Sequence, residues 1–178
     1  MTSFPIRLIL LGLLPTLVLS QPVDMLSVRI RTVETLSFSP LLLAAVREHN
    51  ARGLTPEQIR QRDAAWTAEP GPTPFKLSLQ RSLAGELLRD QVLAHDDIVE
   101  AQLTDARGAL VAAYPTPDDY DQSDEPPWQA VFETDATYVD VSRHAGGRSR
   151  VRIAAPLQAD GRTVGVLMMT VEQPFGDR

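Results

Sequence analysis

Residues 163–171 are apolar at both sets of alternate positions, and few places in a fold accept such a segment. Val164, Val166 and Met168 form one set, and Leu167, Met169 and Val171 form the other. Successive side chains of a strand point to opposite faces of the sheet, so this strand has two apolar faces that both need cover. The sequence therefore predicts a sheet with residues 163–171 in its middle.

Four other segments of the second half alternate between apolar and polar residues, as half-buried strands do. They are residues 98–104, 109–114, 137–142 and 149–157. Turn sequences separate several of them: Asp-Ala-Arg-Gly at 105–108, Ala-Gly-Gly at 145–147 and Asp-Gly at 160–161. Tight turns join antiparallel neighbours, so the five strands predict one antiparallel sheet.

The first part of the chain has helical spacing instead. Apolar residues recur on one face of residues 24–36, and Ser39-Pro40 then supplies an N-cap and a first-turn proline for residues 41–50. The sequence Thr-Pro-Glu-Gln at 55–58 forms a capping box before a short helix that carries Trp66 into the core. Three helices are expected before the first Pro/Gly-rich loop.

Two more helices follow, and together with the strands they define the fold class. Residues 77–94 place leucines on one stripe, and a short helix is expected at 125–132, capped by Ser123 or Asp124. The order of elements predicts an α+β fold: a PAS-like five-stranded antiparallel sheet backed by a long N-terminal helix, with additional helices.

The composition fits one globular domain and excludes several functions. Of 178 residues, 43% are hydrophobic and 22% charged, and the formal net charge is −6. A broad basic surface is missing, so no nucleic-acid partner is expected. Cysteine is absent, which rules out disulfides, thiolate zinc sites and thiol nucleophiles.

The N-terminus predicts export. Arg7 precedes a mostly apolar run at 8–19, which is shorter than the ~20 residues of a membrane-spanning helix. This pattern predicts a secretory signal peptide at 1–20 and a mature domain at 21–178. An uncleaved anchor is the alternative, because residues 23–30 are also moderately apolar. The expected location is periplasmic or extracellular, with the domain either free or tethered to the membrane at its N-terminus.

Three stretches resemble the Cache sensor family, the extracellular PAS-like domains also called PDC sensors. Residues 98–108, which contain a strand ending in Asp-x-x-Gly, are similar to the family's first hairpin. Residues 116–128 resemble its crossover, where an aromatic residue, a glutamine, Asp-Glu and a tryptophan recur at this spacing. Residues 155–167 are similar to its closing hairpin. The resemblance covers residues 22–172 and implies a single Cache domain.

The sequence also departs from the family pattern. Asp121 stands where a second aromatic residue is common, and Pro126-Pro127 replaces small or charged residues. Both changes lie beside the expected pocket, so the ligand class of a relative is not carried over. The chain ends at Arg178, directly after the last strand, whereas the family usually continues into a transmembrane helix and an output module. We therefore expect a stand-alone domain that signals through a separate partner.

Strand alternation sorts the candidate site residues onto one face of the sheet. Val139, Val141, Val151 and Ile153 are expected to face the helices. Tyr138, Asp140, Arg150 and Arg152 are then expected on the opposite face, together with Glu100 and Gln102. The resemblance implies that a small ligand binds on that face, under the crossover.

Two aromatic residues of the crossover, Tyr120 and Trp128, complete the predicted ligand-binding set as a wall above the sheet. An arginine under an aromatic lid suits a carboxylate, through paired, charge-assisted hydrogen bonds. The alternatives stay open: the arginines pair with Asp140 on a solvated strand, and Trp128 packs in the core, as Trp66 is expected to do.

No catalytic or metal site is predicted, and no cofactor. The sequence Asp-x-Asp-x-Ser at 119–123 imitates the start of an EF-hand loop, but Asp124 and Ala130 stand where glycine and glutamate are required. The three histidines are scattered, and neither a nucleophile elbow nor a phosphate-binding glycine loop occurs. An enzyme would need residues that converge from remote positions.

Two functions remain as hypotheses. The first is an exported sensor domain that binds an organic acid or amino acid and signals through a partner. The second is a structural protein–protein module with a vestigial pocket. The family resemblance implies a homodimer through the helix at residues 24–36 for either one.

Overall fold

A computed structural model describes residues 24–144 and 148–174, and the predicted signal segment and the turn at 145–147 lie outside these residues. One five-stranded antiparallel sheet forms the centre of the molecule, in the order β2-β1-β5-β4-β3. The strands are β1 (Ile98–Asp105), β2 (Leu110–Tyr114), β3 (Tyr138–His144), β4 (Arg148–Ala159) and β5 (Arg162–Pro174). β5 is the middle strand, which confirms the position expected from its two apolar faces.

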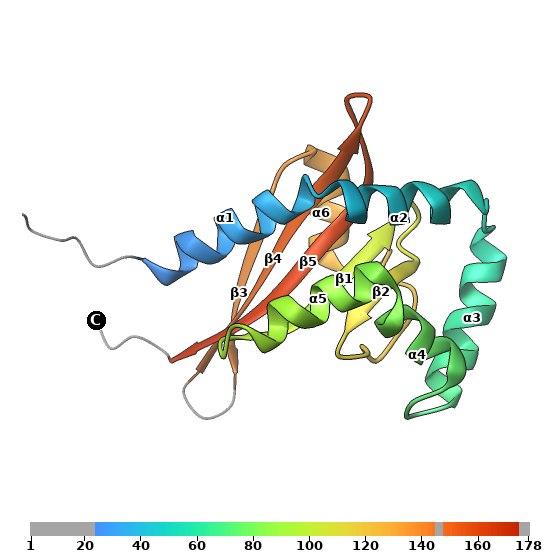
Figure 1. The fold of residues 1–178 in the computed structure, drawn as a ribbon, viewed down its shortest axis with the longest axis horizontal. Helices are drawn as coiled ribbons and strands as arrows, with labels where there is room; N and C mark the ends of the chain where they lie inside the picture. Colours follow the sequence, from blue (N-terminus) through green and yellow to red (C-terminus); the bar gives the residue numbers. More distant parts are fainter. Residues whose placement is uncertain (1–23, 145–147, 175–178) are drawn as a thin grey trace, which may run out of the picture.

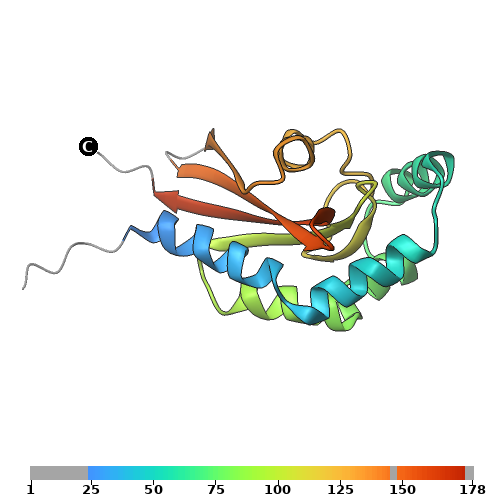
Figure 2. The same ribbon diagram turned by 90° about the horizontal axis from the view of Figure 1, so that it is seen from above.

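The described residues form six helices (Figure 1). They are α1 (Met25–Ser37), α2 (Pro40–Ala51), α3 (Pro56–Ala68), α4 (Pro74–Arg81), α5 (Leu83–Leu93) and α6 (Pro126–Thr134). Of these, α3 and α4 lie beyond the β2 end of the sheet (Figure 1). Helices α1, α2 and α5 cover one face of the sheet, while α6 and the connection before it cover the other (Figure 2). This arrangement confirms the predicted α+β, PAS-like fold.

The long N-terminal helix consists of two segments that meet at Phe38 and Ser39. Ser39 has an extended backbone and Pro40 occupies the first position of α2, as the sequence predicts. The capping box of α3 is present in full: Thr55 Oγ1 accepts from the Gln58 backbone N–H, and the Gln58 side chain accepts from the Thr55 N–H.

The single helix predicted at 77–94 is wrong in one respect, because the chain breaks it at Ser82. Ser82 has an extended backbone (φ −64°, ψ 157°), and its hydroxyl caps α5 by accepting from the Gly85 N–H at 3.0 Å. A Cβ at Gly85 would lie 2.1 Å from the Leu79 carbonyl oxygen, so this tight junction requires glycine. The apolar stripe continues across the break, and for that reason periodicity alone did not reveal it.

The main core lies between the sheet and helices α1, α2 and α5. Val33, Val46, Leu88, Ile153 and Leu167 are among its buried members. A second cluster at the β2 end of the sheet contains Ile59, Trp66, Leu110 and Tyr120, and a third lies under α6. Trp66 is a core residue, as predicted.

Val139, Val151 and Ile153 face the main core as expected, whereas Val141 is 58% exposed. Val141 is paired with Val151 and shares its face, but it lies on the edge strand β3, where the helices give less cover.

Candidate functional site

The strand register aligns polar side chains in rows on the face opposite α1. One row runs from Asp140 on β3 through Arg152 on β4 and Thr170 on β5 to Glu100 on β1. A neighbouring row pairs Ser142 with Arg150. Directly opposite residues of paired strands have side chains on the same face, so alternation on four strands builds one polar surface.

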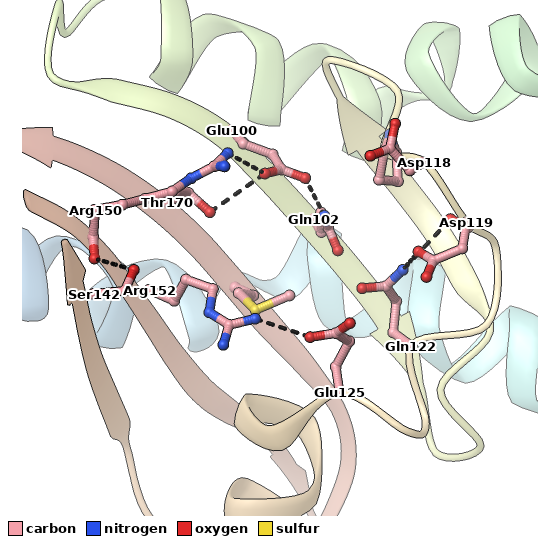
Figure 3. A pocket seen from close by; sticks show the side chains of 12 residues that line it. Glu100, Gln102, Asp118, Asp119, Gln122, Glu125, Ser142, Arg150, Arg152 and Thr170 are labelled. Atoms are coloured by element: carbon pink, nitrogen blue, oxygen red, sulfur yellow. Dashed lines mark hydrogen bonds and ion pairs between the residues drawn. The ribbon is translucent and has the colours of Figure 1, made fainter. Parts of the chain in front are cut away.

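This polar surface forms the floor of a pocket of about 430 Å³, which we call the sheet pocket (Figure 3). The roof on one side is the crossover loop, residues 115–125, which joins β2 to α6. Most of the lining is polar: Glu100, Gln102, Asp118, Asp119, Gln122, Glu125, Ser142, Arg150, Arg152 and Thr170, with Pro117 and Met168 as the apolar members.

Arg152 joins the floor of the sheet pocket to its roof. Its guanidinium donates to Asp140 Oδ2 at 2.9 Å and to Glu125 Oε2 at 2.8 Å. Partial burial lowers the pKa of Arg152, but the hydrogen bonds to Asp140 and Glu125 outweigh this effect and the net direction is upward. Arg152 is therefore a fixed positive charge whose carboxylate partners come from a strand and from the crossover loop.

The start of α6 differs from the sequence prediction, which expected Ser123 or Asp124 to cap this helix. The N-cap of α6 is Glu125 rather than Ser123 or Asp124, and no side-chain hydrogen bond caps the helix. The Glu125 carboxylate turns to Arg152 instead.

The other half of the floor centres on Glu100. Arg150 lies 3.5 Å from Glu100 Oε2, and the Thr170 hydroxyl donates to the same oxygen at 3.4 Å. The other oxygen, Glu100 Oε1, accepts from the Gln102 side-chain amide. Glu100 thus interacts with all three polar neighbours on its side of the floor (Figure 3).

Contacts from distant segments fix the crossover loop. Asp63 of α3 accepts backbone N–H bonds from Tyr120 at 2.8 Å and from Asp121 at 3.2 Å. The Trp66 indole donates to the Pro117 carbonyl at 3.0 Å. Gly108, at the turn of the first hairpin, accepts from the Gln122 N–H at 2.8 Å. Helix α3 and the β1–β2 turn therefore position the roof of the sheet pocket.

Asp119 is the half-buried carboxylate on the roof. Burial raises the pKa of Asp119, in spite of a hydrogen bond from Gln122, and the nearby carboxylates of Asp63, Glu125 and Asp124 add to the rise. The site holds this negative charge where water shields it incompletely.

The expected aromatic wall is not at the sheet pocket. Tyr120 is fully buried in the second cluster, with its ring centroid 5.8 Å from that of Trp66 and 5.6 Å from that of Phe75. Its hydroxyl accepts from Arg62 at 3.4 Å. The crossover loop turns the Tyr120 side chain toward α3 and the β2 end of the sheet and away from the sheet pocket, and burial raises the pKa of Tyr120.

The remaining predicted site residues lie at or beside the sheet pocket. Arg150 and Arg152 line it, and Asp140 lies behind Arg152. Tyr138 and Trp128 pack in the third cluster, where Trp128 stacks on Phe132 with centroids 4.3 Å apart. The alternative of Trp128 as a packing residue matches this position, and so does the alternative of Arg152 paired with Asp140.

Several lining residues escaped sequence reasoning. Thr170 shares the face of Met168 by alternation, so the period of β5 contained a signal for it. Asp119, Gln122 and Glu125 lie on an irregular loop without any period, and no local pattern reveals their direction.

The described residues hold no group of three or more His, Asp or Glu side chains placed to bind a metal ion. Asp121, in the segment that imitates an EF-hand, accepts from the Ser123 N–H at 3.0 Å. His49 and Asp105 form a buried pair, with His49 Nδ1 at 2.9 Å from Asp105 Oδ2, between α2 and the end of β1. Within residues 24–144 and 148–174, no helix is long and apolar enough to cross a membrane.

No protein-family model matches the sequence, and no curated protein matches it. The structure, however, is similar to solved ligand-binding domains of chemoreceptors. Pseudomonas fluorescens CtaA in complex with L-serine is 17% identical, with a TM-score of 0.42, over 84% of this chain and 51% of that one. Pseudomonas aeruginosa PctB in complex with L-Arg is 21% identical, with a TM-score of 0.44, over 83% and 49%.

Campylobacter jejuni Tlp3 in complex with L-valine is 13% identical, with a TM-score of 0.40, over 83% of this chain and 61% of that one. The chain therefore spans between 49 and 61% of the length of these three chains. The extracellular domains of two histidine kinases are similar as well. These similar structures are ligand-binding domains of chemoreceptors and extracellular domains of histidine kinases.

Proposed function

We propose that this chain is an exported sensor domain that binds a small metabolite in the sheet pocket and signals through a separate partner. The observation that carries the proposal is the composition of the two sides of this pocket. Strands β1, β3, β4 and β5 supply one side and the crossover loop supplies the other, and both sides present charged groups. A ligand between them contacts both and can change how the loop sits on the sheet.

The proposed ligand is an organic acid or an amino acid. Guanidinium groups and carboxylates lie around one cavity, so the sheet pocket offers hydrogen-bond donors and acceptors to a small polar molecule. The volume of about 430 Å³ lies within the range of small-molecule sites. The role is binding and not catalysis.

A thermal-shift screen of the purified protein against amino acids, carboxylates, amines and nucleobases tests the proposal. A ligand at 100 times its dissociation constant stabilises the folded state by about 2.7 kcal/mol, a shift of several degrees for a domain of this size. If no compound in the panel raises the melting temperature, the proposal is wrong.

A steric block locates the binding site without any assumption about ligand chemistry. Ser142 lines the sheet pocket on the exposed edge strand, and Ser142→Trp is expected to abolish the shift. Gln158→Trp is the matched control, since Gln158 is also exposed but does not line this pocket. Equal shifts in both variants would place the ligand elsewhere.

A second candidate is the structural module, in which the domain pairs with another protein. Apolar side chains that are exposed on the helical side favour it: Phe38 is 78% exposed at the α1–α2 junction, and Met25 and Leu41 are also exposed. Light scattering after size-exclusion chromatography tests pairing, and Phe38→Ser is expected to weaken a pair formed through this surface.

For the N-terminus we propose export through the segment at residues 1–20, followed by the domain at 21–178. N-terminal sequencing of the protein recovered from the periplasm or the medium tests cleavage. A protein that stays in the membrane fraction with its Met1 end intact would support the anchor instead.

A further inference from the structure

The floor of the sheet pocket contains a buried hydrogen-bond acceptor that is unused. Gln102 is only 5% exposed and lines the pocket, and its Oε1 has no hydrogen-bond partner among the described residues. A buried polar atom without a partner is costly and uncommon in folded proteins. Such an atom in a pocket wall indicates a donor that arrives from outside the chain.

The neighbouring carboxylate fixes the orientation of this amide. The Gln102 side-chain nitrogen donates to Glu100 Oε1, and the reverse orientation would place the Gln102 oxygen against a carboxylate oxygen. The group left for a ligand is therefore the acceptor and not the N–H₂ (Figure 3). A ligand atom that satisfies it must be an N–H or O–H donor.

The two arginines of the pocket already have carboxylate partners. Arg152 holds Asp140 and Glu125 at 2.9 and 2.8 Å, and Arg150 lies 3.5 Å from Glu100. A ligand carboxylate would have to displace a carboxylate of the chain to reach Arg152. This pairing removes much of the reason to expect an anion.

The charge balance of the lining favours a cation. Glu100, Asp118, Asp119 and Glu125 face two arginines, which gives the lining a formal charge of −2. Asp119 is half-buried with three other carboxylates near it. A cation with N–H donors would offset this repulsion and satisfy Gln102 Oε1 at the same time.

We infer that the ligand of the sheet pocket carries an ammonium group, held by Gln102 Oε1 together with the carboxylate of Asp119. The inference rests on the proposed function. It keeps amino acids as ligands, excludes simple organic acids and adds amines.

Three four-carbon probes, titrated into the full chain by calorimetry, test it: 1,4-diaminobutane, 4-aminobutyrate and succinate. Each has four carbon atoms, and in this order an aminomethyl end (CH₂–NH₃⁺) is replaced by a carboxylate, first at one end and then at both. We expect at least one of the two ammonium compounds to bind and succinate not to bind. Succinate binding as tightly as the amines would overturn the inference.

Two variants tie binding to the named atoms. Gln102→Met removes the acceptor at nearly constant volume and is expected to weaken ammonium binding about tenfold. Asp119→Asn removes the negative charge, keeps the shape of the side chain, and is expected to weaken ammonium binding by a similar factor. This second variant keeps the inference testable if Gln102→Met does not fold. Asp160→Asn, at the exposed β4–β5 turn, is the control and should bind as the parent does.

The outcomes separate this inference from the proposed function. If no compound in the thermal-shift panel binds, both the proposed function and the inference are contradicted. A panel whose only ligands lack an ammonium group leaves the proposed function intact and overturns the inference. Another ammonium compound could bind in place of these probes. If both Gln102→Met and Asp119→Asn then bind that compound as tightly as the parent does, the inference is also overturned.

Discussion

Gly165 of β5 lies against Val46 of α2 and against the backbone of β1 at Thr104. A Cβ at this position would lie 2.4 Å from the Thr104 carbonyl oxygen and 2.8 Å from a methyl group of Val46, both in the closely packed centre of the molecule. Neither neighbour is the end of a flexible chain that can move aside. The absence of a side chain at this position is what lets α2 approach the sheet.

Gly165→Ala is therefore expected to destabilise the protein by about 1–3 kcal/mol, as overpacked core positions do. The measurement is the midpoint of urea unfolding followed by circular dichroism. An unchanged midpoint would mean that α2 can shift outward without loss of packing.

Asp119 is a residue where a charge weakens the fold. Because burial raises its pKa above the unfolded value near 3.9, the ionised form is less favourable in the folded chain than in the unfolded one. At neutral pH, Asp119→Asn is expected to stabilise the protein by about 0.5 kcal/mol, the scale of a partly exposed site.

This gain should disappear as the pH falls below the unfolded pKa, where Asp119 is protonated in both states. Thermal unfolding from pH 7 to pH 3 measures it, with Asp160→Asn as the control, since the Asp160 side chain is 98% exposed. Destabilisation by Asp119→Asn at pH 7 would contradict the argument.

At the scale of elements, α1 is attached to the sheet by polar contacts as well as by its apolar face. Arg29 of α1, itself buried, forms two hydrogen bonds with Asp97, directly before β1, at 2.6 and 2.8 Å. Glu34 accepts from the Thr137 hydroxyl at 2.9 Å, just before β3. These contacts fix the rotation of α1 about its own axis.

Asp97→Asn is expected to cost about 1–3 kcal/mol, because it leaves the Arg29 guanidinium buried without its countercharge. Asp90→Asn is the matched control: the Arg89–Asp90 pair is exposed on α5, at 3.3 Å, and exposed pairs contribute little. Urea unfolding at pH 7 compares the two variants.

The pH dependence of this pair has a definite sign. The hydrogen bonds from Arg29 lower the pKa of Asp97, so the pair stabilises the fold above the unfolded pKa near 3.9, and that stability is lost as the pH falls through the lower folded value. The difference between Asp97→Asn and the parent should shrink below about pH 4.

At the scale of the whole molecule, the sheet pocket connects parts that are far apart in the sequence. Its floor comes from β1, β3, β4 and β5, while its roof is held by Asp63 and Trp66 of α3 and by the turn at Gly108. A change at the roof therefore reaches α3 and the first hairpin through direct contacts.

This geometry gives a pH dependence for the inferred ammonium ligand. The affinity for 1,4-diaminobutane, a dication over this range, should fall as the pH is lowered from 7 to 4, because protonation of Asp119 removes a charge that attracts it. The carboxylates of Asp63 on α3 and of Asp124 and Glu125 on the crossover loop lie near Asp119, and the Gln122 side chain donates a hydrogen bond to it.

Calorimetric titration with 1,4-diaminobutane at several pH values measures this affinity. In Asp119→Asn the affinity should depend less on pH than in the parent. An affinity that rises toward acid pH in the parent would contradict an ammonium site next to this carboxylate.

Local patterns in the sequence determined the strands and their faces. Alternation of apolar and polar residues identified β1, β2, β3 and β4, and the two apolar faces of 163–171 identified β5 and placed it in the middle of the sheet. Alternation also put Arg150 and Arg152 on the polar face with Glu100 and Gln102. These features are predictable because a strand's period of two is set by its own backbone and needs no knowledge of distant residues.

Only the tertiary structure decided what the irregular segments do. The side chain of Tyr120 turns into the core because Asp63, 57 residues earlier, binds its backbone N–H. Glu125 turns to Arg152, 27 residues later, and Ser82 breaks a helix whose apolar stripe continues past it. Without a repeating backbone, the direction of a loop side chain depends on partners that the fold brings to it, and those partners are not neighbours in the sequence.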